Sequence, residues 1–190
     1  MEIQLLHVTK SFGEHRLFTD LNLSFREGHI HCIMGASGSG KTTLLSMLMR
    51  LEKPDSGEIK GMEGKRIAAV FQEDRLIEHW DAIRNVKLTC AKTVTTQDIC
   101  TELKKVGIDE GRGKTVRQFS GGMRRRVAIV RALLAESDIL ILDEPFKGLD
   151  EETKKQVMAY VKENTRGKTV LLVTHDKEEA KELGAELAVI

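Results

Sequence analysis

The sequence predicts an α/β fold in which a mainly parallel sheet is covered by helices on both faces. Three features of the 190-residue chain support this prediction. Strand-like apolar segments come first, strands and helices alternate towards the C-terminus, and the stretch between these two parts has a helical pattern alone. Alternating strands and helices are typical of parallel sheets, and the length suits about one domain.

The first half of the chain is expected to supply several strands. Short apolar or alternating segments bounded by turn residues predict strands over residues 3–8, 17–25, 29–34 and 67–71. A turn over 11–14 separates the first two strands, and a helix over 42–51 follows the third. The Pro-Asp-Ser-Gly segment at 54–57 is predicted to be a turn.

Residues 73–120 lack a strong apolar strand and contain helical segments such as 96–106, so they predict a helical insertion. Beyond this insertion, helices are expected over 122–135, 151–164 and 177–183, and strands over 139–143, 169–174 and 186–190. We therefore assign residues 1–72 and 121–190 to an α/β core, and residues 73–120 to a helical subdomain.

The composition narrows the possible classes of function. Lys plus Arg number 30 and Asp plus Glu number 29, giving a formal net charge of +1, which argues against nucleic-acid binding by bulk charge. The 3 Cys residues include no C-x-x-C pair and support neither a disulfide framework nor a zinc cluster; Cys32 is expected in the core. With no signal segment and no apolar run of about 20 residues, we expect no membrane crossing by this chain.

A glycine-rich segment after the strand over 29–34 fits the phosphate-loop pattern G-x-x-x-x-G-K-[ST]. It consists of Gly35, Ala36, Ser37, Gly38, Ser39, Gly40, Lys41 and Thr42, followed by Thr43 in the helix. Its backbone N–H groups and the helix N-terminus would hold the phosphates of a nucleotide. Lys41 is expected to reach the β- and γ-phosphates, and the Thr42 hydroxyl to bind Mg²⁺.

Two adjacent acids end the apolar strand over 139–143. A buried strand delivers Asp143 and Glu144 to the sheet edge where the phosphate loop also lies. Asp143 is expected to bind Mg²⁺ through water, and Glu144 to polarise an attacking water. A helix-capping pair at the strand end is the alternative.

The segment before this strand resembles the signature of the ATP-binding cassette (ABC) ATPases, Leu-Ser-Gly-Gly-Gln. The match consists of Ser120, Gly121 and Gly122, with Phe119 and Met123 in place of the usual Leu and Gln. Residues 126–129 and 131–133 continue the family pattern, whereas Arg125 stands where the family often has Gln. The resemblance implies a P-loop NTPase core of the RecA-like type, with N-terminal antiparallel strands and an inserted helical subdomain that ends at the signature.

The resemblance also implies roles for four further residues. Gln72 matches the Q-loop glutamine that senses Mg²⁺ and the γ-phosphate, and His175 matches the switch histidine that contacts this phosphate. Asp150 matches the D-loop aspartate at the dimer interface, although Lys-Gly replaces the usual Ser-Ala at 147–148. Phe12 matches the aromatic residue that stacks on adenine, and a core Phe at a strand end is the alternative.

Ser120 and two glycines before a helix would form a second anion site, and one ATP cannot readily use two such loops of one small domain. The family solution is a head-to-tail dimer in which the signature of each cassette closes over the ATP of its partner. An ordinary Ser N-cap is the alternative.

The resemblance thus implies a cytosolic ATPase subunit that uses ATP and Mg²⁺ on the cytoplasmic face of the membrane. Its partners would be a second cassette and an integral membrane subunit. The segment 71–76 is similar to ATPases of nitrate, sulfonate and taurine importers, which favours import. Leu76, Ile77 and Trp80 would line a groove for the membrane subunit or belong to the core.

Two other classes of function remain open at this point. One is a soluble ABC ATPase that acts on nucleic acid or ribosomes, and the other is a regulatory module that binds ATP without hydrolysing it. We expect no nucleic-acid partner, and the arginine run at 124–126 is expected to form a solvated face with acidic partners.

Overall fold

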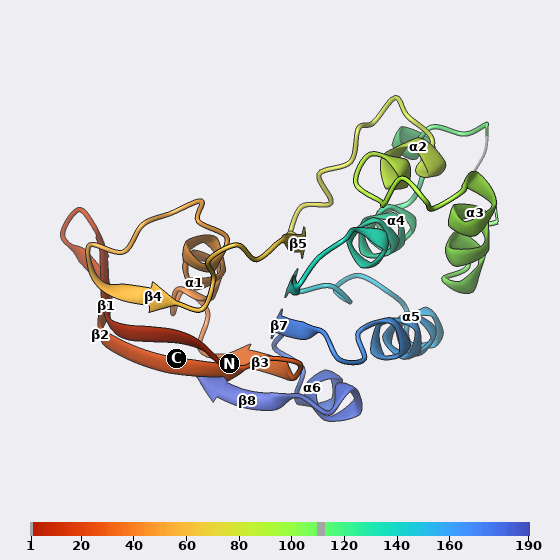
Figure 1. Cartoon of the computed structure of the whole chain (residues 1–190). Helices are drawn as coiled ribbons and strands as arrows, with labels where there is room; N and C mark the ends of the chain where they lie inside the picture. Colours follow the sequence, from red (N-terminus) through yellow and green to blue (C-terminus); the bar gives the residue numbers. More distant parts are fainter. Residues whose placement is uncertain (1, 110–112) are drawn as a thin grey trace.

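The computed structural model describes residues 2–109 and 113–190 and contains two β-sheets (Figure 1). The antiparallel sheet has the order β2-β1-β4 and is formed by β1 (Glu2–Phe12), β2 (His15–Arg26) and β4 (Ser56–Lys60). The parallel sheet has the order β5-β6-β7-β3-β8 and is formed by β3 (Ile30–Met34), β5 (Ile67–Val70), β6 (Ile139–Asp143), β7 (Thr169–Val173) and β8 (Glu186–Val189). The predicted fold class is confirmed.

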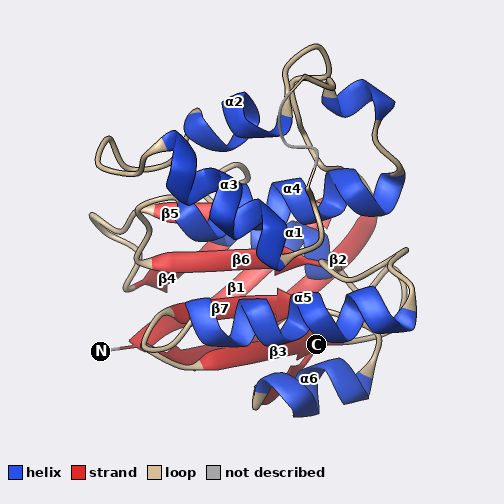
Figure 2. Cartoon of the chain, turned by 90° about the vertical axis from the view of Figure 1, so that its right-hand side faces the viewer, coloured by secondary structure: helices blue, strands red, loops and turns tan. Residues whose placement is uncertain are grey.

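Six α-helices and one 3₁₀ turn are seen in the described ranges. They are α1 (Lys41–Leu48), α2 (Ala82–Lys87), α3 (Thr96–Lys105), the 3₁₀ turn (Val116–Gln118), α4 (Gly121–Leu134), α5 (Glu151–Asn164) and α6 (Lys177–Leu183). Helices α4 and α5 lie on one side of the parallel sheet, and α1 and the antiparallel sheet lie on the other (Figures 1 and 2). The parallel sheet is therefore the middle layer.

Two hydrophobic clusters hold these layers together, one on each face of the parallel sheet. Successive residues of a strand point to opposite faces, so β6 contributes Leu140 and Leu142 to one cluster and Ile139 and Ile141 to the other. The first cluster joins the sheet to α4, α5 and the inserted helices, and the second joins it to α1 and the antiparallel sheet. Cys32, as expected, is buried in the first cluster.

The described residues of the stretch over 73–120 form helices and no strand. Two isolated β-bridges lie outside the sheets, one between Asp81 and Thr115 and one between Cys90 and Ala135. Helix α3 begins with a capping box, in which Asp98 N–H donates to Thr95 Oγ1 and the Asp98 carboxylate accepts from Thr95 N–H. Ile99 and Leu103 of α3 belong to the same cluster as the buried side of α4. The insertion thus packs onto the core without a hydrophobic core of its own.

Strand β4 is absent from the sequence prediction, which has a turn over 54–57. The turn composition extends into the strand, because Gly57 has φ +85° and a Cβ there would lie 2.4 Å from His7 O. Glycine at this position allows close pairing with β1 beside a register shift.

In the parts of the chain that the structure describes, we find no helix long and apolar enough to cross a membrane.

Candidate functional site

A cleft of about 320 Å³ opens where the parallel strands end. It is lined by Phe12, Leu17, Ser37, Gly38, Gly40, Lys41, Thr42, Thr43, Gln72, Asp143, Glu144, Val173 and His175. The polar members come from the segments that follow β3, β5, β6 and β7, because parallel strands deliver their carboxyl ends to one edge of the sheet. The predicted phosphate loop, carboxylates, Gln72 and His175 are thus brought together.

The phosphate loop already has a defined shape. Gly40 precedes α1 with φ +95°, and a Cβ there would lie 2.5 Å from Phe18 Cζ, so a glycine is required. Lys41 is 7% exposed, and its Nζ donates to the carbonyls of Gly35 (2.9 Å) and Ala36 (2.7 Å). The ammonium group therefore lies inside the loop, where a phosphate would face it.

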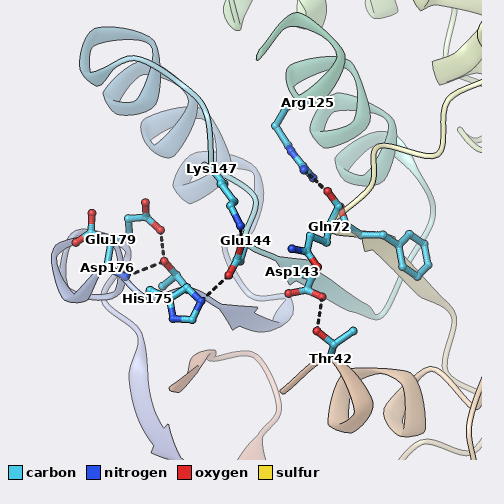
Figure 3. A network of polar contacts seen from close by, with 11 residues as sticks. Thr42, Gln72, Arg125, Asp143, Glu144, Lys147, His175, Asp176 and Glu179 are labelled. Atoms are coloured by element: carbon cyan, nitrogen blue, oxygen red, sulfur yellow. Dashed lines mark hydrogen bonds and ion pairs between the residues drawn. The ribbon is translucent and has the colours of Figure 1, made fainter. Parts of the chain in front are cut away.

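Thr42 and Asp143 meet on one side of the cleft (Figure 3). The Thr42 hydroxyl donates to Asp143 Oδ2 at 3.2 Å, and burial raises the pKa of Asp143 above its ordinary value. A hydroxyl and a carboxylate are hard oxygen donors of the kind that Mg²⁺ prefers, and a nearby cation would compensate the buried charge. The residues present therefore fit a magnesium ion.

Glu144 is held between two cationic or polar partners. Its Oε1 lies 2.6 Å from His175 Nε2 and its Oε2 lies 2.6 Å from Lys147 Nζ (Figure 3). The Lys147 hydrogen bond lowers the pKa of Glu144 and outweighs the opposing effect of burial. With φ 47°, Glu144 adopts a left-handed backbone that is uncommon outside glycine, and its N–H donates to Val173 O at 2.9 Å. The Glu144 carboxylate is thus kept ionised and is held in the lining of the cleft by Lys147 and His175.

A polar network supports the segment around His175. Lys154 of α5 lies 2.6 Å from Asp176 Oδ2 and 2.7 Å from Glu179 Oε1, which joins α5 to the first turn of α6. Thr174 donates to Glu179 through its hydroxyl and accepts from Asp176 N–H at 3.1 Å (Figure 3). Sequence analysis missed the pairs of Lys154 with Asp176 and Glu179, because they join two segments that are distant in the sequence. It also missed the pair of Lys147 with Glu144, although the two residues are only three positions apart.

Two expected site residues occupy the rim of the cleft. Phe12 is 50% exposed, with Lys10 Nζ 5.0 Å from its ring centroid, so the alternative of a core Phe is wrong. Its stacking on adenine remains a prediction. Gln72 is exposed at the rim, and its backbone carbonyl accepts a hydrogen bond from Arg125.

The signature residues lie elsewhere. In the described part of the chain, Ser120, Gly121, Gly122 and Asp150 do not line the Lys41 cleft. Ser120 caps α4 by accepting from Met123 N–H at 3.2 Å, and Asp150 caps α5 by accepting from Thr153 N–H at 2.9 Å.

The two caps are close neighbours on the surface. A Cβ on Gly122 would lie 3.3 Å from Leu149 Cδ2 and 3.7 Å from Gly148 O. The signature and the D-loop segment therefore form one exposed surface next to the N-terminus of α4.

The solvated face expected for the arginines at 124–126 is wrong for Arg125 and Arg126, whereas the expected acidic partner is found for Arg125, which pairs with Asp74. Arg125 is 8% exposed and donates to backbone carbonyls after β5. Arg126 donates to Val106 O (2.7 Å) and Gly107 O (3.1 Å), which ties α4 to the end of α3. Carbonyl acceptors in distant loops give no signal in the local sequence, so a charge run was read as solvated.

Comparisons with known proteins agree with this geometry. The ABC transporter family model matches residues 18–147, which is more than half of the chain. Among solved structures, the dimeric ATP-binding cassette MJ0796 in a post-hydrolysis state with ADP and Pi is 30% identical, with a TM-score of 0.85 over 99% of this chain and 94% of that chain. The chain belongs to the ABC transporter family, as the sequence predicted.

Three of the curated relatives carry names of import or uptake proteins. The sulfate/thiosulfate import ATP-binding protein CysA 2 of Rhizobium meliloti is 35% identical over 100% of this chain, and the L-cystine import ATP-binding protein TcyN of Bacillus subtilis is 35% identical over 97%. The glycine betaine uptake ATP-binding protein YehX of Escherichia coli is 36% identical over 99%. The chain spans 57%, 80% and 67% of the lengths of these three relatives.

Proposed function

We propose that this chain is the ATP-hydrolysing cassette of an ABC transporter and acts with a separate membrane subunit. The observation that carries the proposal is the convergence of three features in one cleft. They are the phosphate loop, the carboxylate of Asp143 beside Thr42, and Glu144 paired with Lys147 and His175. Glu144 is the group that a module binding ATP without turnover would not need. Its contact with His175 supports hydrolysis over that alternative.

Each residue has a distinct task in the proposed reaction. Lys41 exchanges its loop carbonyls for the β- and γ-phosphates, and Thr42, Gln72 and Asp143 would hold Mg²⁺. The ion supplies charge neutralisation at the phosphates when bound. Glu144 accepts a hydrogen bond from the attacking water, and His175 turns from Glu144 towards the γ-phosphate.

The position of the signature supports a second cassette. Ser120, Gly121 and Gly122 lie outside the cleft of their own chain, at the exposed start of α4. In the proposed head-to-tail dimer they face the ATP of the partner, and Asp150 crosses the same interface. ATP-driven closure of this dimer and its reopening after hydrolysis would move the membrane subunit.

The names of the relatives support import. We place the chain on the cytoplasmic face of a membrane because it would act there with the proposed membrane subunit. These names specify sulfate or thiosulfate, L-cystine and glycine betaine, which differ in charge and size, so we propose no particular substrate. The similarity to nitrate, sulfonate and taurine importers stays a prediction. We also propose 73–120 as the helical subdomain that receives the membrane subunit, and no nucleic-acid partner.

The test is nucleotide binding and ATP turnover by the purified chain. Lys41→Ala should abolish ATP binding, while Lys155→Ala, which removes an exposed lysine of α5, should bind and hydrolyse ATP as the unchanged chain does. Unchanged nucleotide affinity in Lys41→Ala would reject the site. Nucleotide-dependent dimers without turnover in the unchanged chain would support the regulatory alternative instead.

A further inference from the structure

The loop after β5 is held by an arginine that the proposed reaction does not use. Arg125 of α4 donates from Nη1 to Phe71 O at 2.6 Å and from Nη2 to Gln72 O (Figure 3). Its Nε lies 3.2 Å from Asp74 Oδ1. The guanidinium therefore holds two consecutive carbonyls of the loop and forms an ion pair with Asp74. Its donors have the fixed geometry of a planar fork, whereas a lysine carries all its donors on one nitrogen at the end of a flexible chain.

A second arginine of the same helix fixes the rest of the loop. Arg131 donates from Nη1 to Arg75 O at 2.7 Å and from Nη2 to Asp74 O at 2.9 Å. This stretch belongs to neither sheet in the described chain, so the arginines provide the donors that a neighbouring strand would otherwise supply. The backbone around Gln72 is thus attached to α4 rather than to the sheet.

Burial makes the Arg125 attachment a strong constraint. Arg125 is 8% exposed, and the Asp74 side chain beside it is also largely buried. Separating the members of a buried ion pair strongly destabilises a protein, so Arg125 and Asp74 are expected to remain paired. Helix α4 begins at Gly121 with Ser120 as its N-cap, so Arg125 lies in its second turn, between the signature and the loop.

We infer that Arg125 is a positioning residue that sets where Gln72 presents its amide in the cleft. The inference rests on the proposed function. Because the Gln72 carbonyl is bound to α4, a shift of α4 moves Gln72 relative to Asp143 and Thr42. The signature end of α4 and the metal side of the cleft are thereby connected through one side chain. A glutamine in place of Arg125, as the family often has, would carry no charge to pair with Asp74.

Hydrogen–deuterium exchange tests the attachment without turnover. Arg125→Lys keeps the positive charge near Asp74 and loses the two-carbonyl grip, so the variant should remain folded. Amide exchange in a peptide covering 71–76 should become about tenfold faster, with exchange in β6 and β7 unchanged. Arg84→Lys is the matched control, because Arg84 is exposed on α2. Equal exchange in both variants would overturn the inference.

A double-mutant cycle tests the effect on the reaction. With Gln72 present, Arg125→Lys should lower kcat for ATP hydrolysis about tenfold and leave nucleotide affinity unchanged. A small misplacement of Gln72 would slow the chemical step. In the Gln72→Ala background the same change should lower kcat by less than about twofold, since Arg125 acts through Gln72.

Each other outcome has a clear meaning. An equal loss in both backgrounds would show a merely structural role, and a Gln72→Ala variant with full turnover would remove the group that Arg125 is inferred to position. Either result overturns the inference and leaves the proposed function standing. Absence of ATP turnover in the unchanged chain would instead reject the proposed function, and the exchange measurement would still decide the attachment.

Discussion

Two glycine-rich segments of this chain begin helices, and only one of them forms a complete site. The phosphate loop precedes α1 and contains the buried ammonium of Lys41, with Asp143 across the cleft. The signature precedes α4 with Ser120 as its N-cap and lies on an exposed surface. Both segments stand at helix N-termini, which favour anions.

The difference lies in what the parallel sheet brings to each segment. Strand ends of β3, β5, β6 and β7 surround the phosphate loop, so a cation, two acids, an amide and an imidazole converge there. Among the described residues, a Cβ on Gly122 of the signature would meet Leu149 and Gly148 of the D-loop segment. Glycines at a helix start therefore make a site only where other chemistry converges, and the signature obtains it in the proposed dimer.

The largest expected effect concerns the complete site. Glu144→Gln keeps the side-chain shape but removes the charge that accepts from water, so turnover should fall by about 10²–10⁴-fold. ATP binding should persist, because Lys41 and the loop hold the phosphates. Single-turnover assays and nucleotide binding measure the two parts separately. Turnover near that of the unchanged chain would remove Glu144 from its role.

The second prediction tests whether the incomplete segment completes a partner site. Lys41→Ala and Gly122→Asp should each be inactive as pure proteins, since one loses its phosphate loop and the other blocks its signature. A mixture should recover about a quarter of the turnover, because half of the dimers then combine one intact loop with one intact signature. A mixture that hydrolyses no ATP would contradict the sharing of sites between the two cassettes of a head-to-tail dimer.

The third prediction separates the two readings of Ser120. Ser120→Ala removes the acceptor for Met123 N–H, so the free energy of unfolding of the monomer should fall by about 1 kcal/mol. If Ser120 also faces a partner ATP, turnover in the dimer should fall further than the loss of folded protein explains. Denaturant titration and ATPase assays on matched amounts of folded protein compare the two. Turnover that follows only the folded fraction would support the ordinary N-cap.

The smallest expected effect is at the departure from the family signature. Met123 is partly buried against the first hydrophobic cluster, and its backbone N–H makes the cap bond that any residue could make. Met123→Gln should therefore change turnover by less than about twofold and lower the free energy of unfolding by about 0.5 kcal/mol. A large gain in turnover would show that the usual glutamine has a task that this chain lacks.

Local sequence predicted the parts of the fold that local chemistry determines. The apolar strand over 139–143 and the helix over 151–164 agree residue for residue with β6 and α5, because burial on both faces and a capping Asp150 define them. Strand β4 was not predicted. Its pairing with β1 requires a glycine at position 57, and glycine there also indicates a turn.

The candidate site was predictable where a motif specifies both residue type and spacing. Lys41, Thr42 and Asp143 lie together as their motifs imply. Arg125 could not be found in this way, because it binds the Gln72 carbonyl, which lies 53 positions away and is brought near only by the fold. Lys147 is only three positions from Glu144, but the motif specifies no residue type at its position. Side chains that pair with distant backbone carbonyls leave no periodic pattern in the sequence.

The hydrogen bonds of Lys41 to its own loop have a kinetic consequence. Because Nζ already bridges the Gly35 and Ala36 carbonyls, the loop keeps its concave shape before any phosphate arrives. An incoming nucleotide exchanges partners with a preorganised cradle and orders no backbone, so the entropic penalty of association is small. We therefore expect nucleotides to associate at a rate set by diffusional encounter. Differences in affinity between nucleotides should then arise from their dissociation rates.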